Sequence, residues 1–425
     1  MLTASYSAFS AGLHARAGRT RLPTNVAFEV TRRCPLVCHH CYNNLPVADR
    51  QAQAAELTLD DHRRILDELA EMGSLWLLYT GGEIFARPDF LDIYGYAKRR
   101  GFLVTLFTNA TMITPAIADR LAVDRPFAIE VTLYGASAAS YEALTHLPGS
   151  YQRCLGGIHL LHERRLPLRL KTVAVRTNQH EIADMQRFAD GLNLPFKFDA
   201  MINPRLDSSQ SPLDVRLDPA ECVALDLGDS RRMAEWERFV QRHAGSHAGG
   251  NDNLYRCGGG QSSFSVDPYG GMSICVLSEQ DKYDLKTGTV AEGWNKFLHA
   301  VRGKKVTRPT KCSRCQIKAM CGMCPANGEL ENGDPEAPVD FLCQVAHLRA
   351  HALGLPVAEH GACEYCPGGA GHADLLAALV RVNAQAPAGA ARALAKPERR
   401  RLPVLEGSST SADPGCGAGC GSCRS

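Results

Sequence analysis

The cysteines are the residues of this sequence with the most evident chemistry. The chain has 17 cysteines among 425 residues, and all except Cys154 and Cys222 fall into groups. At about 4 % of the chain they are too sparse for a disulfide scaffold, which needs roughly 8–10 % in a short secreted protein. Grouped thiols in a long chain indicate metal or redox chemistry instead. Cys154 and Cys222, standing alone, are expected to be small buried hydrophobic residues.

Three cysteines follow one another closely after a predicted strand. They lie in the segment Cys34-Pro-Leu-Val-Cys38-His-His-Cys41, shortly after the strand expected at 26–31. Three thiolates in one loop can bind one face of a four-iron four-sulfur cluster, because thiolate is the usual ligand of such clusters. Such a cluster keeps one open iron for a small-molecule ligand. Zinc is the alternative, although zinc sites usually space their cysteines in two separate pairs.

A second group of seven cysteines lies in a Gly- and Cys-rich region, at Cys257, Cys275, Cys312, Cys315, Cys321, Cys324 and Cys343. By spacing alone these could form two zinc ribbons. The region has little apolar periodicity, so we expect metal ligands to organise it. Five more cysteines have no assignment: Cys363, Cys366, Cys416, Cys420 and Cys423. The last three, in a flexible Gly-rich tail, could form a fused substrate-like segment, a self-modification site or a metal-handling tail, or they could be incidental thiols.

Alternating strand-like and helix-like segments must position the first cysteine group. The helix-like segments include 57–72, with Leu59, Ile65, Leu66 and Leu69 inward, and 89–100. The expected strands cover residues 26–31, 75–80, 102–107, 128–133, 168–175 and 196–199. Strands separated by helices form βαβ units and a parallel sheet, open or closed as a barrel. Active residues then belong at the carboxyl ends of the strands.

Charge and hydropathy exclude several classes of partner. The 47 Lys and Arg against 45 Asp and Glu give a formal charge of +2, which offers no general attraction for nucleic acid or anionic lipid. No apolar run reaches the roughly 18 residues of a membrane span, and the opening residues lack a signal-peptide core. We therefore expect a cytoplasmic protein with no nucleic-acid or membrane partner. The residues after 384 are expected to be disordered, following a helix at 373–383.

The first cysteine loop, with Tyr42 after it, resembles the N-terminal signature of the radical S-adenosylmethionine (radical SAM) family. A second match, Gly81-Gly82-Glu83, ends the next predicted strand, where that family contacts the methionyl amine of SAM. Glycine permits the close backbone approach this needs. The resemblance implies a four-iron four-sulfur cluster bound by Cys34, Cys38 and Cys41, with SAM on its unique iron.

Two further positions resemble SAM contacts of the family. Thr108-Asn109 ends the third strand, where the family often meets the SAM ribose; glycine frequently follows, whereas this chain has Ala110. Thr132, late in the fourth strand, stands where many members carry serine. The alternatives are a helix N-cap for Thr108-Asn109 and an exposed strand threonine for Thr132. The resemblance implies reductive cleavage of SAM to a 5′-deoxyadenosyl radical, which takes a hydrogen atom from the substrate.

The second cysteine group resembles the SPASM domain of radical SAM enzymes that modify peptides and proteins, which binds two auxiliary iron–sulfur clusters. One departure is the two residues between Cys321 and Cys324, where the family commonly has three. The family pattern implies a distal cluster held by Cys312, Cys315, Cys321 and Cys343. It implies a nearer cluster held by Cys257, Cys275 and Cys324, with its last position open to a substrate thiolate or a non-cysteine ligand.

The sequence thus predicts an α/β protein: a partial (β/α)6 TIM-like barrel, a small cysteine-rich iron–sulfur domain and a flexible tail. The expected boundaries are an N-terminal extension at 1–22, a radical SAM core at 23–225, a SPASM domain at 226–360 and the tail at 361–425. Auxiliary clusters can accept the electron that a substrate radical loses, which favours a net oxidation. We expect modification of a peptide or protein side chain, by a thioether or carbon–carbon crosslink, in ribosomal peptide maturation.

Other functions remain open from the sequence. Formylglycine formation, as in anaerobic sulfatase maturases, and a small-molecule substrate use the same chemistry. A non-enzymatic zinc or iron–sulfur scaffold has no need of the Gly81-Gly82-Glu83 match. The expected partners are the peptide or protein substrate and a flavodoxin- or ferredoxin-like electron donor. Asp199, at the end of the last strand, could accept a substrate proton or simply cap the strand.

Overall fold

The computed structural model describes residues 6–243 and 252–385. The chain divides into two compact units, the first joining Met1–Arg216 to Tyr255–Lys304 and the second joining Leu217–Leu254 to Lys305–Ser425. The boundaries expected from the sequence stay a prediction. The units differ from them by placing residues 255–304 with the first unit.

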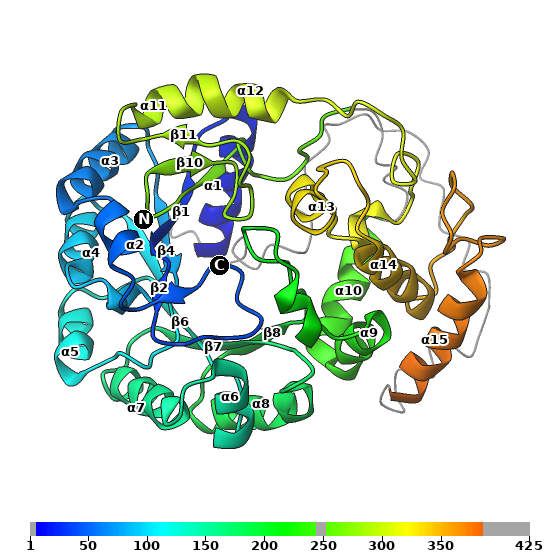
Figure 1. The fold of residues 1–425 in the computed structure, drawn as a ribbon, viewed down its shortest axis with the longest axis horizontal. Coiled ribbons are helices and arrows are strands. Elements are labelled where there is room, and N and C mark those ends of the chain that lie inside the picture. The colour runs from blue at the N-terminus through cyan, green and yellow to red at the C-terminus, as the bar shows by residue number, and fades with distance from the viewer. Residues whose placement is uncertain (1–5, 244–251, 386–425) are drawn as a thin grey trace. The chain divides into compact units, whose positions relative to one another are not determined.

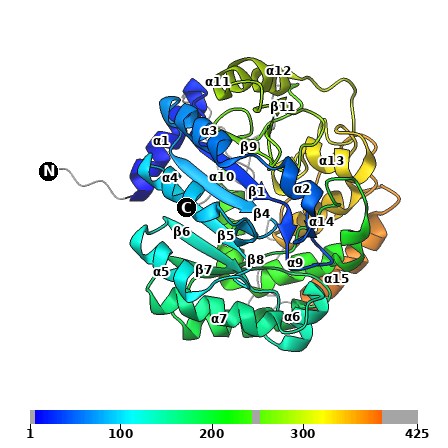
Figure 2. The ribbon, with the colours of Figure 1, turned by 60° about the vertical axis from the view of Figure 1, so that its left-hand side comes forward.

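Six parallel strands form the body of the first unit (Figures 1 and 2). In spatial order they are β1 (Asn25–Thr31), β4 (Trp76–Gly81), β5 (Leu103–Thr108), β6 (Ala128–Thr132), β7 (Leu168–Val173) and β8 (Phe196–Asp199). Helices follow the strands around their outer side in Figure 1: α3 (Leu59–Glu71), α4 (Phe90–Arg99), α5 (Pro115–Val123), α6 (Ala138–Thr145), α7 (Ser150–Glu163) and α8 (Ile182–Gly191). The predicted α/β fold with a partial parallel barrel is confirmed.

The two faces of this sheet differ in chemistry. On β1, Val26, Phe28 and Val30 are at most 2 % exposed. These side chains face the surrounding helices, and the side chains that alternate with them face the inside of the barrel. On β6 and β7 the inward-facing residues include Glu130 and Lys171, whose carboxylate and ammonium groups lie 3.4 Å apart. Burial lowers the pKa of Lys171 to about 7. Apolar side chains therefore anchor the helices, while the inner face carries charge.

Helix α3 shows how the local sequence sets an element. Thr58 and Asp61 form a capping box at its first turn. Ile65, Leu66 and Leu69 are fully buried, as predicted. The prediction for Leu59 was wrong: Leu59 is only partly buried, and His62 is buried in the same helix. Successive residues of an α-helix lie 100° apart around its axis, so His62, one turn after the cap, faces the core more directly than the first residue, Leu59.

The sheet continues past β1 in a way the sequence did not indicate. Strand β9 (Ser263–Val266) pairs in parallel with β1 and is followed by antiparallel β10 (Gly271–Ser273) and β11 (Tyr283–Asp284). Gly270, at φ 93°, makes the turn between β9 and β10. The unit also contains α1 (Tyr6–Thr20), β2 (Arg33–Cys34), β3 (Leu45–Pro46), α2 (Arg50–Ala55), α11 (Val290–Glu292), α12 (Leu298–Gly303), three 3₁₀ turns at Ile84–Ala86, Gln179–Glu181 and Ser211–Val215, and a π-helical turn at Gly293–Phe297.

The second unit is helical where it is described. It contains α9 (Pro219–Gly228), α10 (Ser230–His243), a 3₁₀ turn at Lys318–Met320, α13 (Pro325–Asn332), α14 (Asp340–Ala352) and α15 (His372–Gln385). Asp226 of α9 is buried and paired with Arg349 of α14 at 2.6 Å and with Arg232 of α10. The helix predicted at 373–383 is confirmed as α15. The flexible tail expected at 361–425 is wrong over 361–385, which contains this helix and the buried Cys363 and Cys366; the rest of that range lies outside the described residues.

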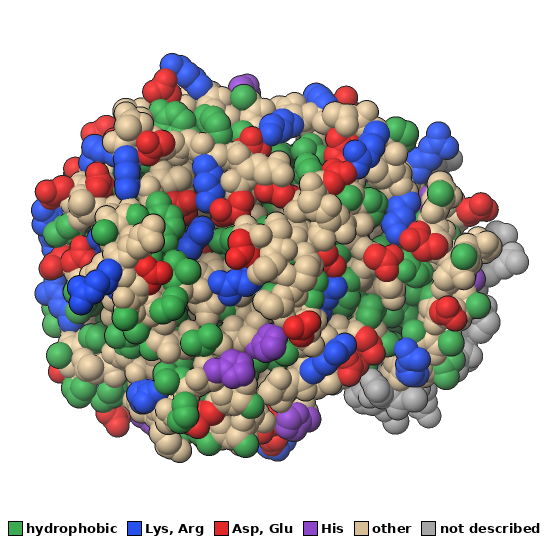
Figure 3. Space-filling view, in the orientation of Figure 1, with side chains coloured by type: hydrophobic (Ala, Val, Ile, Leu, Met, Phe, Trp, Pro, Cys, Tyr) green, Lys and Arg blue, Asp and Glu red, His purple; other side chains and the backbone are tan. Residues whose placement is uncertain are grey.

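Surface charge is mixed. Figure 3 shows Lys and Arg side chains interspersed with Asp and Glu over the visible face. Among the described residues, none of the helices combines the length and apolar character that crossing a bilayer requires.

Candidate functional site

The first cysteine loop lies directly after β1, at the carboxyl end of the barrel strands. Cys34 and Cys38 are each 7 % exposed and pack with Leu36; Cys41 and Tyr134 pack against the same cluster. The loop backbone is held by the end of α6, since the Val37 amide donates to the carbonyl of Thr145 at 3.0 Å. The three thiols thus converge in one place, as the spacing predicted.

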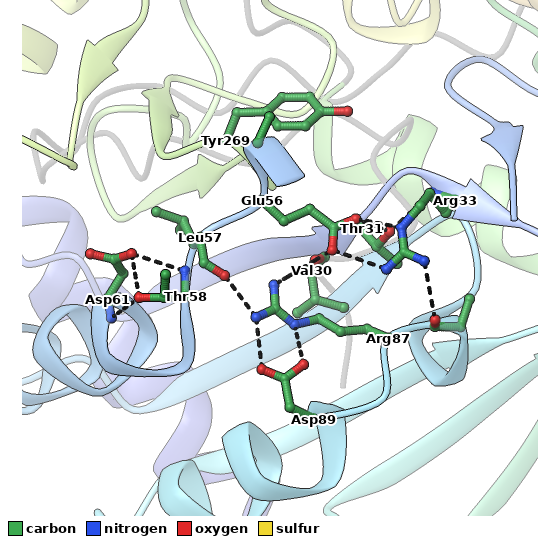
Figure 4. A network of polar contacts seen from close by, with 12 residues as sticks. Val30, Thr31, Arg33, Glu56, Leu57, Thr58, Asp61, Arg87, Asp89 and Tyr269 are labelled. Atoms are coloured by element: carbon green, nitrogen blue, oxygen red, sulfur yellow. Dashed lines mark hydrogen bonds and ion pairs between the residues drawn. The ribbon is translucent and has the colours of Figure 1, made fainter. Parts of the chain in front are cut away.

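A buried ion network fixes the entry to this loop (Figure 4). The Arg33 guanidinium, one residue before Cys34, contacts both carboxylate oxygens of Glu56 at 2.9 and 3.1 Å. Arg87 lies 3.9 Å from the same carboxylate and makes two hydrogen bonds to Asp89. Because Arg87 follows the Gly81-Gly82-Glu83 segment, the network ties the cysteine loop to that segment.

A second buried carboxylate fixes the exit from the loop. Glu29 of β1 accepts hydrogen bonds from Tyr42 at 3.0 Å and from Asn43 at 2.6 Å. Burial raises the pKa of Glu29, which the Arg32 guanidinium at 3.5 Å opposes. Arg205 donates to the carbonyl of Cys41 at 3.1 Å. The loop is therefore positioned at both ends by groups of the barrel.

Gly81 and Gly82 lie against the backbone of the chain that enters the cysteine loop. A Cβ atom on Gly81, which has φ 130°, would lie 2.1 Å from the carbonyl oxygen of Thr31. On Gly82 it would lie 2.5 Å from the carbonyl oxygen of Arg33. The amides of Gly82 and Glu83 donate to those two carbonyls at 2.8 and 3.0 Å. Glycine is thus required here to bring two strand ends together.

Glu83 joins the ends of β4 and β5. Its carboxylate is fully buried and accepts hydrogen bonds from the Thr108 hydroxyl at 2.7 Å and the Asn109 amide at 2.8 Å. Burial raises the pKa of Glu83 to about 7, against the effect of these hydrogen bonds. The Asn109 side-chain amide lies 3.5 Å from Cys34 Sγ. The structure therefore brings together Cys34, Glu83, Thr108 and Asn109, all predicted from the sequence.

Ala110 has a backbone conformation that favours glycine. Ala110 has φ 59°, a conformation that costs a non-glycine residue energy. A Cβ atom on Gly157 of α7 would lie 2.2 Å from the carbonyl oxygen of Ala110. A glycine at position 110 would adopt this conformation without strain.

Thr132 and Asp199 end β6 and β8. The Asp199 carboxylate accepts a hydrogen bond from the Met201 amide at 3.0 Å, which is the contact of a strand-end cap. Its role as proton acceptor stays a prediction, as does the SAM contact of Thr132.

The three loop thiols need a positive charge to ionise. Burial raises the pKa values of Cys34, Cys38 and Cys41, and their mutual proximity adds to the effect for Cys34 and Cys38. A metal centre supplies that charge and binds thiolate. Three convergent thiols in one buried loop fit the face of an iron–sulfur cluster.

Cysteines of the second group converge within the second unit. A small cavity there is lined by Cys312, Cys315, Cys321 and Cys343. Burial raises the pKa of Cys315 and of Cys321 to about 12. These four are the residues assigned to the distal cluster, and their thiols fit a four-iron cluster as a donor set. The nearer set stays a prediction, since Cys257 and Cys275 belong to the first unit and Cys324 to the second.

The sequence did not identify Glu29, Arg33, Glu56 and Arg87 as part of the site. Arg33 directly precedes Cys34, and Glu29 interrupts an apolar strand, whereas Glu56 lies far along the chain from both motifs. Charge inside a buried strand was the available signal. Cys154 and Cys222 are buried, as expected for isolated thiols.

The family profile described as "Radical SAM superfamily" matches residues 28–189. Residues 28–189 are therefore similar to a radical SAM domain. That range contains the cysteine loop and the segment from Gly81 to Asn109.

Two curated relatives share sequence with this chain. The AdoMet-dependent heme synthase of Methanosarcina barkeri is 33 % identical over 163 residues, 38 % of this chain and 46 % of that protein, so the chain spans about half its length. The mycofactocin maturase MftC of Mycobacterium tuberculosis is 26 % identical over 358 residues, 80 % of this chain and 88 % of that protein. Among solved structures, Streptococcus suis SuiB bound to its precursor peptide SuiA has a TM-score of 0.59 at 17 % identity, covering 81 % of this chain and 82 % of SuiB. This last likeness concerns the fold.

Proposed function

We propose that this chain is a radical SAM/SPASM enzyme that oxidatively modifies a side chain of a peptide substrate. The observation that carries the proposal is the convergence of the Cys34–Cys38–Cys41 loop with the Glu83–Thr108–Asn109 contacts at the carboxyl end of the barrel. When bound, a four-iron cluster with SAM supplies a 5′-deoxyadenosyl radical that removes a hydrogen atom from a substrate.

In this proposal the barrel residues hold the reactants and exclude water. Cys34, Cys38 and Cys41 would bind the cluster, and Gly81, Gly82 and Glu83 would present backbone groups beside it to the SAM amine. Thr108, Asn109 and Thr132 would meet the rest of SAM. Asp199, on the last strand, would accept the proton released when the substrate is oxidised.

The second unit supports an oxidation. A substrate radical that forms a new bond loses one electron and one proton. A distal cluster held by Cys312, Cys315, Cys321 and Cys343 would accept electrons from a nearer cluster held by Cys257, Cys275 and Cys324. A flavodoxin- or ferredoxin-like protein would reduce the SAM cluster. We place these reactions in the cytoplasm, where thiols remain reduced.

A peptide substrate is favoured by MftC, a relative that matches over most of this chain. MftC is named a maturase and matches over 80 % of the chain. A small-molecule substrate is the second candidate, because the heme synthase relative is 33 % identical over 163 residues.

The first test is anaerobic incubation of the protein with SAM and dithionite, followed by mass spectrometric measurement of 5′-deoxyadenosine. We expect its release by the wild type and none above background from Cys38→Ala, whereas Cys154→Ala should retain it. Equal release by wild type and Cys38→Ala would contradict the proposal.

A second test separates the two substrate classes. Short Cys-rich peptides encoded beside the gene, and a porphyrin precursor of heme, would each be incubated under the same conditions. Loss of two hydrogen masses from a peptide supports peptide oxidation. A change in the mass of the porphyrin with no change in any peptide supports the small-molecule function.

A further inference from the structure

Cys363 and Cys366, which the sequence left unassigned, lie beside two histidines in the second unit. Among the described residues, His347, His360, Cys363 and Cys366 offer ligand atoms that all lie within 4.8 Å of one another. All four side chains are buried, with exposed fractions of 1–6 %. His347 comes from α14, and the other three come from the segment His360-Gly-Ala-Cys363-Glu-Tyr-Cys366.

The separations between these atoms match the edges of a tetrahedral metal site. Nε2 of His347 lies 3.5 Å from Cys363 Sγ and 3.6 Å from Cys366 Sγ. Zinc bonds of about 2.3 Å to sulfur and 2.0–2.1 Å to nitrogen place neighbouring ligand atoms roughly 3.3–3.8 Å apart. One imidazole nitrogen facing two thiols at this separation is better explained by a shared ion than by hydrogen bonds, since neutral Nε2 has a single lone pair.

The His347 ring is oriented as a metal ligand is. Nδ1 of His347 lies 2.8 Å from the carbonyl oxygen of Cys343, which can only accept, so Nδ1 carries the proton and Nε2 is free to bind. Ligand histidines commonly donate their second nitrogen to a backbone carbonyl in this way. The His360 ring brings both of its nitrogens near Cys366 Sγ, Nδ1 at 3.1 Å and Nε2 at 3.9 Å, and Nδ1 also lies 3.0 Å from the carbonyl oxygen of Ala358.

The loop between the two cysteines is fixed by contacts that leave the thiols facing inward. Glu364 is paired with Lys311 at 2.8 Å, and the Tyr365 hydroxyl donates to Asp340 of α14 at 2.7 Å. None of the residues in these two contacts belongs to the group of two histidines and two cysteines. These contacts help to hold both thiols beside α14.

We propose that His347, His360, Cys363 and Cys366 bind one zinc ion in a closed structural site, in addition to the iron–sulfur clusters. Two thiolates balance the ion's charge, so a neutral centre is buried. A two-iron cluster of the Rieske type also takes two cysteines and two histidines, but it divides them between two irons. Zinc is favoured because all four donor atoms lie within 4.8 Å of one another, as they do around a single ion. The ion would fasten the segment 360–366 to α14 one turn after Cys343, and so would position that cluster ligand.

The test is metal analysis of the full-length protein, purified anaerobically from cells supplied with zinc and iron. We expect about one zinc per chain, with zinc K-edge absorption showing two sulfur and two nitrogen neighbours at about 2.3 and 2.0 Å. The double variant Cys363→Ser/Cys366→Ser should lose the zinc and keep its iron. The matched control Cys222→Ser, a buried thiol of the same unit, should keep both metals.

Two histidines of α14 provide a matched pair of single variants. His347→Gln should lower the zinc content, whereas His351→Gln, one turn further along α14, should not. If the double variant keeps zinc but loses about four irons, its cysteines are cluster ligands and the proposal is overturned. If that variant does not fold, the wild-type spectrum decides, since no zinc, or zinc with four sulfur neighbours, also overturns it. None of these readouts depends on SAM cleavage, so the proposed function can fail independently.

Discussion

The cysteine loop of the barrel and the cysteines of the second unit differ in what holds them. The loop between Cys34 and Cys41 begins and ends at buried carboxylates, Glu56 and Glu29, that belong to the barrel framework. Its backbone also bonds to the end of α6. The protein alone therefore sets the positions of these thiols, and a cluster enters a site already formed.

The second unit has less framework around its cysteines. Residues 305–324 contain a single 3₁₀ turn, Lys318–Met320, and the segment 353–371 has no helix or strand. Its described apolar core includes Phe239, Ile317, Met320, Ala346 and Ala350, with Cys315 and Cys321 packed against it. A region with so few regular elements depends on its ligands for stability. The comparison separates a preformed site from one that metals complete.

Removing the metals should affect the two units very differently, and this is the largest effect we expect. Structural zinc contributes several kcal/mol to folding, and losing even about 3 kcal/mol raises local amide exchange by roughly 100-fold. In protein stripped of zinc and iron, the amides of α14 and of 357–366 should exchange at least about 100-fold faster. Those of β1, β4 and β5 should change little. Hydrogen exchange read by mass spectrometry measures both, and equal loss of protection in the two units would refute the comparison.

Removing the carboxylate of Glu56 should damage the preformed site from within. Glu56→Ala leaves the Arg33 guanidinium buried with an uncompensated charge, which typically costs about 3–5 kcal/mol, whereas Arg87 keeps its pairing with Asp89. Urea unfolding can be followed by tryptophan fluorescence in a Trp236→Phe background, where Trp76 and Trp294 report on the first unit alone. Glu71→Ala, an exposed residue ending α3, is the control and should shift the unfolding free energy by less than about 0.5 kcal/mol. Equal effects of the two substitutions would mean that the network does not hold the loop.

The same difference limits what the sequence could predict. The six barrel strands were predictable because each is an apolar run of β-character between helical segments, and the range 196–199 matched β8 in full. The residues Cys34, Gly81 and Asn109 could be placed together, since the ends of parallel strands meet at one edge. The pairing of Glu29 with Asn43 could not, because no local pattern indicates which buried charges meet.

The sequence patterns around β9 and around the histidine–cysteine group are weaker still. Strand β9 has only four residues and joins β1 from more than two hundred residues away, which no periodicity reveals. His347 and Cys363 are brought together by a loop without regular structure. The sequence left Cys363 and Cys366 unassigned and did not indicate His347 or His360, because the grouping of these residues depends on tertiary contacts.

Glu83 should make the barrel site pH-sensitive. Its pKa is raised from 4.5 to about 7 by burial, so between these values the folded protein holds a proton that the unfolded chain has lost. The unfolding free energy should therefore fall as pH rises through this window, by about 1.4 kcal/mol per unit and on the order of 3 kcal/mol in total, and level off above it. Glu83→Gln does not titrate and should lack this slope. Urea unfolding of metal-free protein between pH 4.5 and 8 measures the slope; identical slopes would assign the pH dependence to other groups.

The smallest expected effect tests how rigid the preformed site is. Ala110 holds φ 59° directly after Asn109, a conformation that costs roughly 1–2 kcal/mol for a residue with a Cβ. Glycine removes that cost but loses more chain entropy on folding, by roughly 0.5–1 kcal/mol. Ala110→Gly should thus stabilise the first unit by less than about 1 kcal/mol, measured by the same urea titration, and should leave 5′-deoxyadenosine release unchanged. Destabilisation would mean that the Ala110 methyl, which lies close to where a side chain on Gly157 would stand, contributes packing that outweighs its backbone strain.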